Sequence, residues 1–497
     1  SSSSSGSSSS SSNHEHPVHH THSHPGPHEA MFFMFDALLL GTAVLHLSMH
    51  EKFHTLQHTV VLFVLGLIYA VVHEKLDVNC YDSRSYRMWM GIDSHVMLWT
   101  LLPPLILGDA MTIDTSVVAN VAGQCLYLAG PGVLLCAAPT AAFLRMILPH
   151  WPWLLCAACG AIFSATDPVA VVSLLKELGA PPTLTVQIQG ESLLNDGTSI
   201  VLFAVAYTML EGKDYGVQEV ILDLLRNVLG AMALGMVIGF CFNAWIHNAA
   251  NRLSHSSVLI QVSLTLCSAY VSWIVAEGIF HTSGVITTVS CALVLAEGMW
   301  HIILHKEAME HIWHTIEFIM NTLIFFLAGA RTGRTMVGSD IRHHDFWILI
   351  VIYVALTVIR FLVLVLSIPI LSRLSRDKSR VTLPDVLVMT WGGLRGAVGL
   401  ALAIQVSKDR ALEHIEKTVA DRVLFYTGGV ACLTLLINAT TSPWLVEQLG
   451  ITRTGFAKSW MVKRIKGQLH NIAQESIAEL PEDHQHRSEA AAAAASS

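Results

Sequence analysis

A succession of long apolar segments constrains the fold of this chain more than any other feature. From residue 31 onward we count thirteen of them, and the connections between them are too short to hold a soluble domain. About 20 apolar residues in a helix match the thickness of a bilayer, and a helix satisfies its own backbone polar groups inside lipid. The segments lie near residues 31–49, 58–73, 93–109, 116–148, 152–178, 184–210, 220–247, 256–277, 282–304, 311–330, 346–371, 384–406 and 420–446. We therefore predict an all-α polytopic membrane protein with thirteen transmembrane helices.

The composition agrees with a membrane protein. Of the 497 residues, 53% are hydrophobic and only 13% are charged, whereas a soluble domain carries about 25% charged residues. The formal net charge of −8 is modest and gives no reason to expect a nucleic-acid partner. Most of the nine cysteines lie inside apolar segments, and we interpret even the closely spaced Cys156 and Cys159 as small packing residues.

The two ends of the chain differ from the rest. Residues 1–30 are rich in serine and then histidine, and we expect a disordered tail. Its histidines could bind a metal or sense pH, although a flexible polar tail is the interpretation that we favour. The predicted transmembrane domain spans residues 31–449, and residues 450–497 form a tail that is first basic and then acidic.

The predicted orientation rests on the basic part of the C-terminal tail, which favours a cytoplasmic C-terminus. The loops on the two sides of the membrane carry nearly equal numbers of basic residues. The basic residues that would lie on the opposite side are Lys75, Arg84, Arg87, Arg331, Arg334, Arg342, Lys408, Arg410 and Lys417.

One apolar segment carries acidic residues near its middle. Glu191, Asn195 and Asp196 lie in the stretch from Gly190 to Leu210, and a charge at the centre of a membrane helix costs about 2.5–3.5 kcal/mol. Helical spacing places Glu191 and Asn195 on one face, and Ser192 and Asp196 on the neighbouring face. Such a concentration of oxygen-bearing side chains suits a site for a hard cation or a proton.

Two further segments are predicted to be broken helices. Pro168 removes a backbone donor and disfavours helix at Asp167, so the helix should unwind around Thr166 and Asp167. In the twelfth segment Arg395 stands among Gly392, Gly393, Gly396 and Gly399. A simple proline kink and close packing at small residues are the alternatives for each break taken alone.

The matched positions of the two breaks predict an internal repeat. If segments one to six and eight to thirteen are the two halves, each break is the fifth element of its half. Interrupted helices in corresponding positions indicate an inverted-repeat transporter that binds its substrate where the breaks cross.

Three motifs carry a resemblance to a known family. FSATDPVAVVSLLKELG, GESLLNDGTSIVLF and WGGLRGAVGLALA, in this order, resemble the monovalent cation/proton antiporter-1 family, the sodium/proton exchangers. The wording of the motifs is closest to plant salt-overly-sensitive, sperm-type and NhaP-type members. The resemblance covers residues 31–446 and implies an NhaA/NhaP-like antiporter fold with crossed broken helices.

The resemblance also implies roles for individual residues. Asp196 would alternately hold the cation and the proton, with Asp167, Thr166, Ser192 and Asn195 completing the ion site. Glu191 would form a structural salt bridge with Arg395. Arg360 resembles a second arginine of the core, although a snorkelling residue at a helix end is an equal alternative.

The expected activity is electroneutral exchange of one Na+ for one H+ by alternating access, serving pH and sodium homeostasis. Asn rather than Asp at position 195 is what implies electroneutrality within the family. A core of segments four to six and eleven to thirteen would move against a dimerising scaffold in the plasma membrane. We expect no enzymatic activity and no cofactor beyond the transported Na+ and H+.

Other functions are open from the sequence. Li+ or K+ could replace Na+, and a K+(Na+)/H+ exchanger of an organelle membrane is the nearest alternative. A cation channel would show polar stripes on several segments, whereas the charge here is concentrated in three. A membrane sensor would leave Asp167, Glu191, Asp196 and Arg395 without a purpose.

Overall fold

The described part of the chain is almost entirely helical, as the sequence predicts. The computed structural model describes residues 27–48, 58–76, 81–213, 216–250, 257–303, 305–338, 341–376, 381–412, 414–451, 464–466 and 468. Each of the thirteen predicted segments coincides with one helix or with a run of successive helices. Among the described residues, the one pairing of extended backbone is an isolated contact between Asp167 and Leu394.

Nineteen α-helices follow one another along the described chain, with four short π-helical segments (η) inside the longer runs. They are α1 Pro27–Ser48, α2 His58–Leu76, α3 Tyr81–Gly91, α4 Ser94–Met111, α5 Thr115–Tyr127, η1 Leu128–Gly132, α6 Val133–Ile147, α7 Trp153–Ile162, α8 Val169–Glu177, α9 Pro182–Leu210, α10 Val217–Leu225, η2 Arg226–Gly230, α11 Ala231–Ala250, α12 Ser257–Ile274, η3 Val275–Phe280, α13 Gly284–Met299, α14 Lys306–Gly338, α15 His343–Leu374, α16 Leu383–Trp391, α17 Ala397–Asp409, α18 Lys417–Leu433, η4 Thr434–Ala439 and α19 Thr440–Gln448.

Nine of the described helical runs are long and apolar enough to span a membrane. The pair α3–α4 is a tenth candidate, bent by 88° at its break. The other predicted spans correspond to the shorter helix α13 and to the pairs α7–α8 and α16–α17. The number of thirteen crossings therefore stays a prediction, as does the inverted repeat.

Both predicted helix breaks are present, and they meet. Helix α7 ends at Ile162 and α8 begins at Val169, with Pro168 at the N-terminal boundary where its missing N–H is tolerated. Helix α16 ends at Trp391 and α17 begins at Ala397. The backbone N–H of Asp167 donates to the carbonyl oxygen of Leu394 over 2.9 Å. The two unwound segments, 227 residues apart in the chain (394 minus 167), thus cross in the structure.

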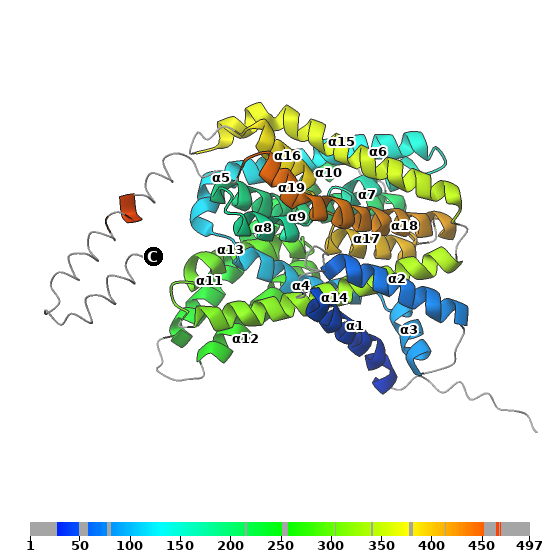
Figure 1. The fold of residues 1–497 in the computed structure, drawn as a ribbon, viewed down its shortest axis with the longest axis horizontal. Coiled ribbons are helices and arrows are strands. Elements are labelled where there is room, and N and C mark those ends of the chain that lie inside the picture. The colour runs from blue at the N-terminus through cyan, green and yellow to red at the C-terminus, as the bar shows by residue number, and fades with distance from the viewer. Residues whose placement is uncertain are drawn as a thin grey trace, which may run out of the picture.

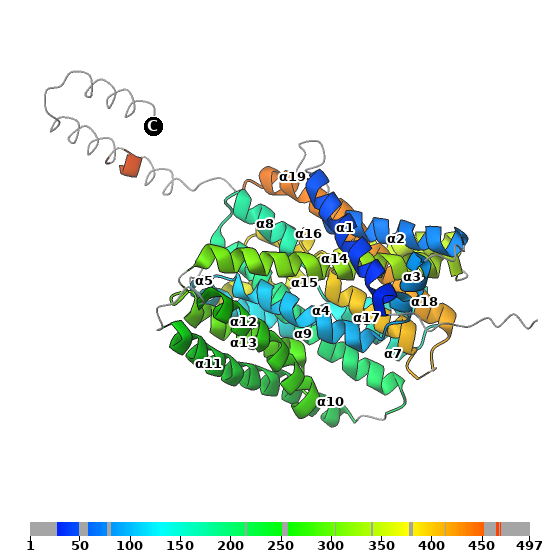
Figure 2. The ribbon, with the colours of Figure 1, turned by 90° about the horizontal axis from the view of Figure 1, so that it is seen from below.

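The helices pack in two groups around this crossing (Figures 1 and 2). In one group α2 lies along α14, while α4, α11 and α12 pack against α13. In the other, α5, α6 and α7 surround α9, and α15, α17 and α18 lie beside them. The second group contains segments four to six and eleven to thirteen, the predicted moving core, whose motion stays a prediction.

Close helix contact in the first group depends on glycine. A Cβ atom at Gly329 of α14 would collide with the backbone carbonyl of Phe63, and one at Gly66 of α2 would collide with that of Phe326. Small residues let helix backbones approach in this way inside a membrane, where no hydrophobic driving force brings helices together.

The outer faces of the bundle are apolar. Trp347, Leu362 and Leu366 of α15 are exposed, as are Phe240 and Trp245 of α11. Exposed apolar faces of this kind are expected to contact lipid in a membrane protein.

The predicted N-terminal tail ends slightly earlier than expected, because α1 begins at Pro27 and includes residues 27–30. Residues 1–26 and most of residues 450–497 lie outside the described residues, so the predicted disorder of the tails is untested.

Candidate ion-binding site

The crossing of the two breaks holds Asp167 in a defined position. One carboxylate oxygen of Asp167 accepts from the backbone N–H of Val169 over 3.1 Å, which caps the first turn of α8. Its own N–H is bonded to Leu394. The side chain is therefore fixed at the point where the unwound segments meet, with its second oxygen available to a ligand.

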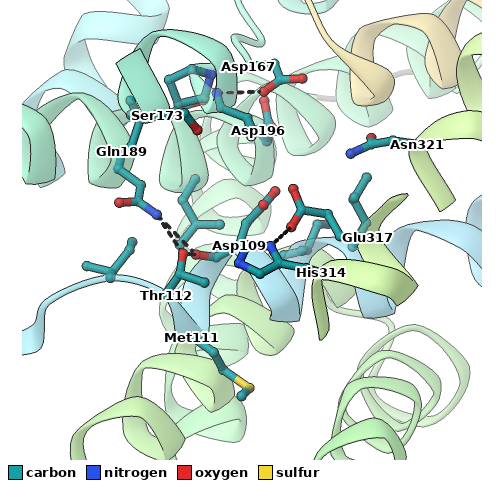
Figure 3. Close-up of a pocket in the computed structure, with 18 of the residues that line it drawn as sticks. Asp109, Met111, Thr112, Asp167, Ser173, Gln189, Asp196, His314, Glu317 and Asn321 are labelled. Atoms are coloured by element: carbon teal, nitrogen blue, oxygen red, sulfur yellow. Dashed lines mark hydrogen bonds and ion pairs between the residues drawn. The ribbon is translucent and has the colours of Figure 1, made fainter. Parts of the chain in front are cut away.

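Asp196 of α9 lies beside Asp167 (Figure 3). Its Oδ1 atom is buried and has no hydrogen-bond partner, and the backbone N–H of Thr166 interacts with the carboxylate. The hydroxyl of Ser192, one turn earlier on α9, donates to the carbonyl oxygen of Thr166. A buried carboxylate oxygen without a partner is costly unless a cation or a proton binds to it.

A cavity of about 390 Å³ reaches from one end of the bundle to these carboxylates. Asp167, Ser192 and Asp196 line its inner part, and Asp114 and Lys176 are among the residues that line the rest. The hydroxyl of Ser116 and nearby backbone N–H groups lower the pKa of Asp114, so this residue is a permanent negative charge beside α5. The cavity thus offers a negatively charged path to Asp196.

The structure adds three cavity residues that the sequence interpretation missed. Asp109 of α4 and Glu317 of α14 face Asp167 and Asp196 across the cavity, and His314 approaches Glu317 at 3.6 Å (Figure 3). The carboxyl groups of Asp109 and Glu317 thus add two acids to the wall of the cavity opposite Asp167 and Asp196. Glu317 is an acid inside an apolar segment, and the same pattern singled out Asp196 in the sequence. The sequence could therefore have identified Glu317 in the same way.

The predicted partner of Glu191 is wrong. Glu191 pairs with Arg360 of α15, with 2.8 Å between Oε1 and Nη2, and both side chains are buried. Arg360 also donates through Nε to the carbonyl oxygen of Met389 at 3.2 Å, so it connects α9, α15 and the end of α16. Arg395 instead donates to the carbonyl oxygen of Ala165 at 3.1 Å.

The physical reason is the direction in which each side chain points. Glu191 faces α6 and α15, because it lies on the side of α9 that turns away from the cavity, together with Asn195. Arg395 projects from the break between α16 and α17 toward the break between α7 and α8, where it donates to the carbonyl oxygen of Ala165. Of the two options left for Arg360, a core arginine is therefore correct and a snorkelling helix-end residue is not.

Asn195 does not line the cavity. Its Nδ2 donates to the carbonyl oxygen of Ser164 at 2.7 Å and to Oγ1 of Thr166 at 3.3 Å, and its Oδ1 accepts from Ser199. The amide therefore holds the unwound segment against α9. Its predicted part in ion binding stays a prediction.

Comparisons with known proteins agree with this geometry. Residues 37–448 match the family model of the sodium/hydrogen exchanger transmembrane domain. The chain is 30% identical over 470 residues to "Sodium/hydrogen exchanger 7" of Arabidopsis thaliana, covering 92% of this chain and 40% of that protein. It is 28% identical over 404 residues to "Low-affinity Na(+)/H(+) antiporter NhaS1" of Synechocystis, covering 79% of this chain and 70% of that protein.

The fold is also that of a solved antiporter. The structure of the sodium proton antiporter MjNhaP1 from Methanocaldococcus jannaschii superposes with a TM-score of 0.66 at 19% identity, covering 84% of this chain and 98% of that chain. The chain spans about two fifths and three fifths of the length of its two Arabidopsis relatives. A family match across residues 37–448, together with crossed broken helices and an NhaP-type fold, shows that this chain belongs to the sodium/hydrogen exchanger family.

Proposed function

We propose that this chain is a secondary active antiporter that exchanges one Na+ for one H+ by alternating access. The observation that supports the proposal best is the unpartnered, buried Oδ1 of Asp196 at the inner end of an acidic cavity. Na+ and H+ would compete for this carboxylate. Because only one of them can neutralise it at a time, competition alone would couple the two fluxes.

The surrounding oxygens favour a hard monovalent cation. Asp167, the hydroxyl of Ser192 and the Thr166 segment lie beside Asp196, and all of them offer oxygen ligands. The relatives named as Na+/H+ antiporters support Na+ over K+. Asp109 and Glu317 line the same cavity and would attract the entering cation.

Replacing the proposed exchange carboxylate tests the assignment. Asp196→Asn should abolish Na+-driven proton flux in proteoliposomes, because an amide neither ionises nor holds a proton in competition with Na+. Glu297→Gln is the matched control, since Glu297 is an exposed acid on α13 away from the cavity and its removal should leave the flux unchanged. Sustained flux in the Asp196→Asn protein would disprove the assignment. Parallel assays with Na+, Li+ and K+ decide the ion.

Electroneutral exchange has its own test. One Na+ against one H+ moves no net charge, so setting the membrane potential of the proteoliposomes to either sign should leave the wild-type rate nearly constant. A rate that changes several-fold with the sign of the potential would show that the stoichiometry is not one to one, since moving one charge through 100 mV is worth about 2.3 kcal/mol.

The proposal includes a homodimer in the plasma membrane with a cytoplasmic C-terminus. The basic C-terminal tail supports this orientation. The run α18–α19 begins at the end of α14 that lies far from the acidic cavity and crosses the bundle toward the cavity end. With this orientation the acidic cavity opens to the cytoplasm.

A further inference from the structure

A second cavity lies at the other end of α14 and has the opposite charge. Its volume is about 420 Å³, and it is formed between the end of α3, the end of α14, the end of α17 and the start of α18. The acidic cavity contacts α14 between Glu310 and Asn321, whereas this one contacts it between Arg331 and Gly338. The charged residues that line it are Arg331, Arg334, Lys408, Arg410, Lys417 and a single acid, Asp421.

Arg331 is the deepest of these cations. Its side chain is 7% exposed, and its Nη2 donates to the carbonyl oxygen of Ile92 at 2.9 Å. Its Nε is buried without a partner, and no ion pair joins it to an acid of the described residues. Asp409 attracts it at longer range, while Arg334 repels it. A buried guanidinium in this position is costly unless an anion joins it.

Three of the neighbouring cations, Arg334, Lys408 and Lys417, differ in what they contact. Nε of Arg334 lies 3.4 Å from Oε1 of Glu74. Lys408 donates to the carbonyl oxygens of Gly91 and Ile92 rather than to an acid. Lys417 is exposed at the first position of α18. Carbonyl oxygens carry no net charge, so they do not neutralise Lys408, which Asp93 and Asp409 attract at longer range. The lining itself contains five cations and one acid.

We propose that this cavity binds a phosphate group, either as inorganic phosphate or as the headgroup of an anionic lipid. The planar guanidinium of Arg331 presents paired donors that match phosphate oxygens, and the lysines supply point charges around them. The cavity is larger than one phosphate ion, so it also accommodates a lipid headgroup.

The position of the cavity implies that bound phosphate affects transport. This step rests on the proposed antiporter function. Helix α14 lies along α2 in one packing group, while α17 and α18 belong to the other. A phosphate that contacts both groups holds them together at the end of the bundle where the acidic cavity does not open. Binding of phosphate should therefore slow exchange, because alternating access requires the two helix groups to move apart at this end of the bundle.

Binding is measured first, without transport. Inorganic phosphate is titrated into the purified full chain in a neutral detergent, with thermal unfolding and calorimetry as readouts. Phosphate should stabilise the protein, and Arg331→Gln should weaken binding about tenfold or more, as loss of a charge-assisted hydrogen bond does. Lys417→Gln, which removes an exposed charge and should fold normally, should weaken it about two- to fivefold.

Two control variants test whether binding depends on this cavity in particular. One removes a positive charge elsewhere, and the other removes the proposed exchange carboxylate. Lys213→Gln removes an exposed lysine just beyond α9 that does not line the cavity and should bind as the wild type does. Asp196→Asn should also bind normally, so a failure of the proposed exchange mechanism leaves the binding result intact. Equal binding by the Lys417→Gln, Arg331→Gln and wild-type proteins would overturn the site.

The source of the phosphate is decided in vesicles. Exchange is compared in vesicles of neutral phosphatidylcholine alone, with phosphate added, and with phosphatidylglycerol in place of part of the lipid. Inhibition by added phosphate identifies the free ion, and inhibition by phosphatidylglycerol alone identifies the headgroup. In either case Lys417→Gln should relieve the inhibition. If phosphate does not bind in detergent and neither phosphate nor phosphatidylglycerol slows exchange in vesicles, the proposal is wrong.

Discussion

Four polar side chains of α9 lie in pairs on neighbouring faces of the helix, as helical spacing predicts. Ser192 and Asp196 line the acidic cavity, whereas Glu191 and Asn195 face α6 and α15. Periodicity within one helix is a local property, so the sequence is sufficient to predict it. The partner of Glu191 is not a local property. Choosing between Arg360 and Arg395 requires the packing of three helices, and motif resemblance placed the ion pair on the wrong arginine.

Double-mutant cycles should distinguish the two arginines. Glu191→Gln alone leaves Arg360 buried without its partner and should cost about 3–5 kcal/mol of stability. Adding Arg360→Met should cost much less than the sum of the single changes, because the second change removes the uncompensated charge. Unfolding of the purified protein in denaturant, or its thermal unfolding, measures the cycle.

The control is the same cycle with Arg395→Met. Since Arg395 donates to Ala165 and not to Glu191, its coupling to Glu191 should be much weaker than that of Arg360. Strong coupling of Glu191 to Arg395, without coupling to Arg360, would restore the pair predicted from the sequence.

At the scale of helices, the sequence located the breaks because they have local causes. Pro168 lacks an N–H, and the glycines around Arg395 disfavour helix. It did not locate Asp109 opposite Asp167, since that position depends on how α4 packs beside the two broken helices. The sequence therefore predicted ion-site residues on α9 and at the first break, and it missed the cavity residues on α4 and α14.

The crossing itself should be sensitive to a single methyl group. A Cβ atom at Gly396 would lie 2.6 Å from Oδ2 of Asp167 and still closer to its Cβ. Gly396→Ala should therefore displace Asp167 and reduce Na+-driven proton flux at least about tenfold, since small misplacements of a reacting group are costly. Flux in proteoliposomes, normalised to the amount of folded protein, measures the effect.

Gly130 in η1 provides the comparison, because a Cβ atom there meets no other atom within 4 Å. Gly130→Ala should transport at the wild-type rate. Equal rates for the two alanine variants would mean that the crossing tolerates movement of Asp167.

For the molecule as a whole, the charges at the two ends of α14 explain why the loops gave no clear orientation. Arg331, Arg334, Lys408, Arg410 and Lys417 lie on the side opposite to the predicted cytoplasmic face, against the positive-inside tendency. They surround one cavity rather than being spread over the loops. Basic residues that line a binding cavity carry no information about membrane orientation. A simple count of basic residues does not distinguish them from the residues that set the orientation.

The two cavities should be accessible from opposite sides of the membrane. Ser173 lines the acidic cavity and Ser407 lines the basic one, so Ser173→Cys and Ser407→Cys form a matched pair. A membrane-impermeant thiol reagent should modify the first cysteine only from the side where the C-terminus lies, and the second only from the other side. Mass spectrometry reports the modification, with the unmutated chain as the baseline for its own cysteines. Modification of both from one side would contradict the proposed arrangement.

The buried pair between Glu191 and Arg360 also has a consequence for biosynthesis. The two residues are 169 positions apart, and ribosomes add about 5–20 residues per second. Glu191 therefore enters the membrane roughly 8–34 s before its partner has been made. During that interval the nascent helix must carry Glu191 as the neutral acid or keep it sheltered at the insertion machinery, because lipid does not solvate an unpaired carboxylate. Assembly of the second half of the protein is thus required for the first half to remain in the bilayer in its final, charged form.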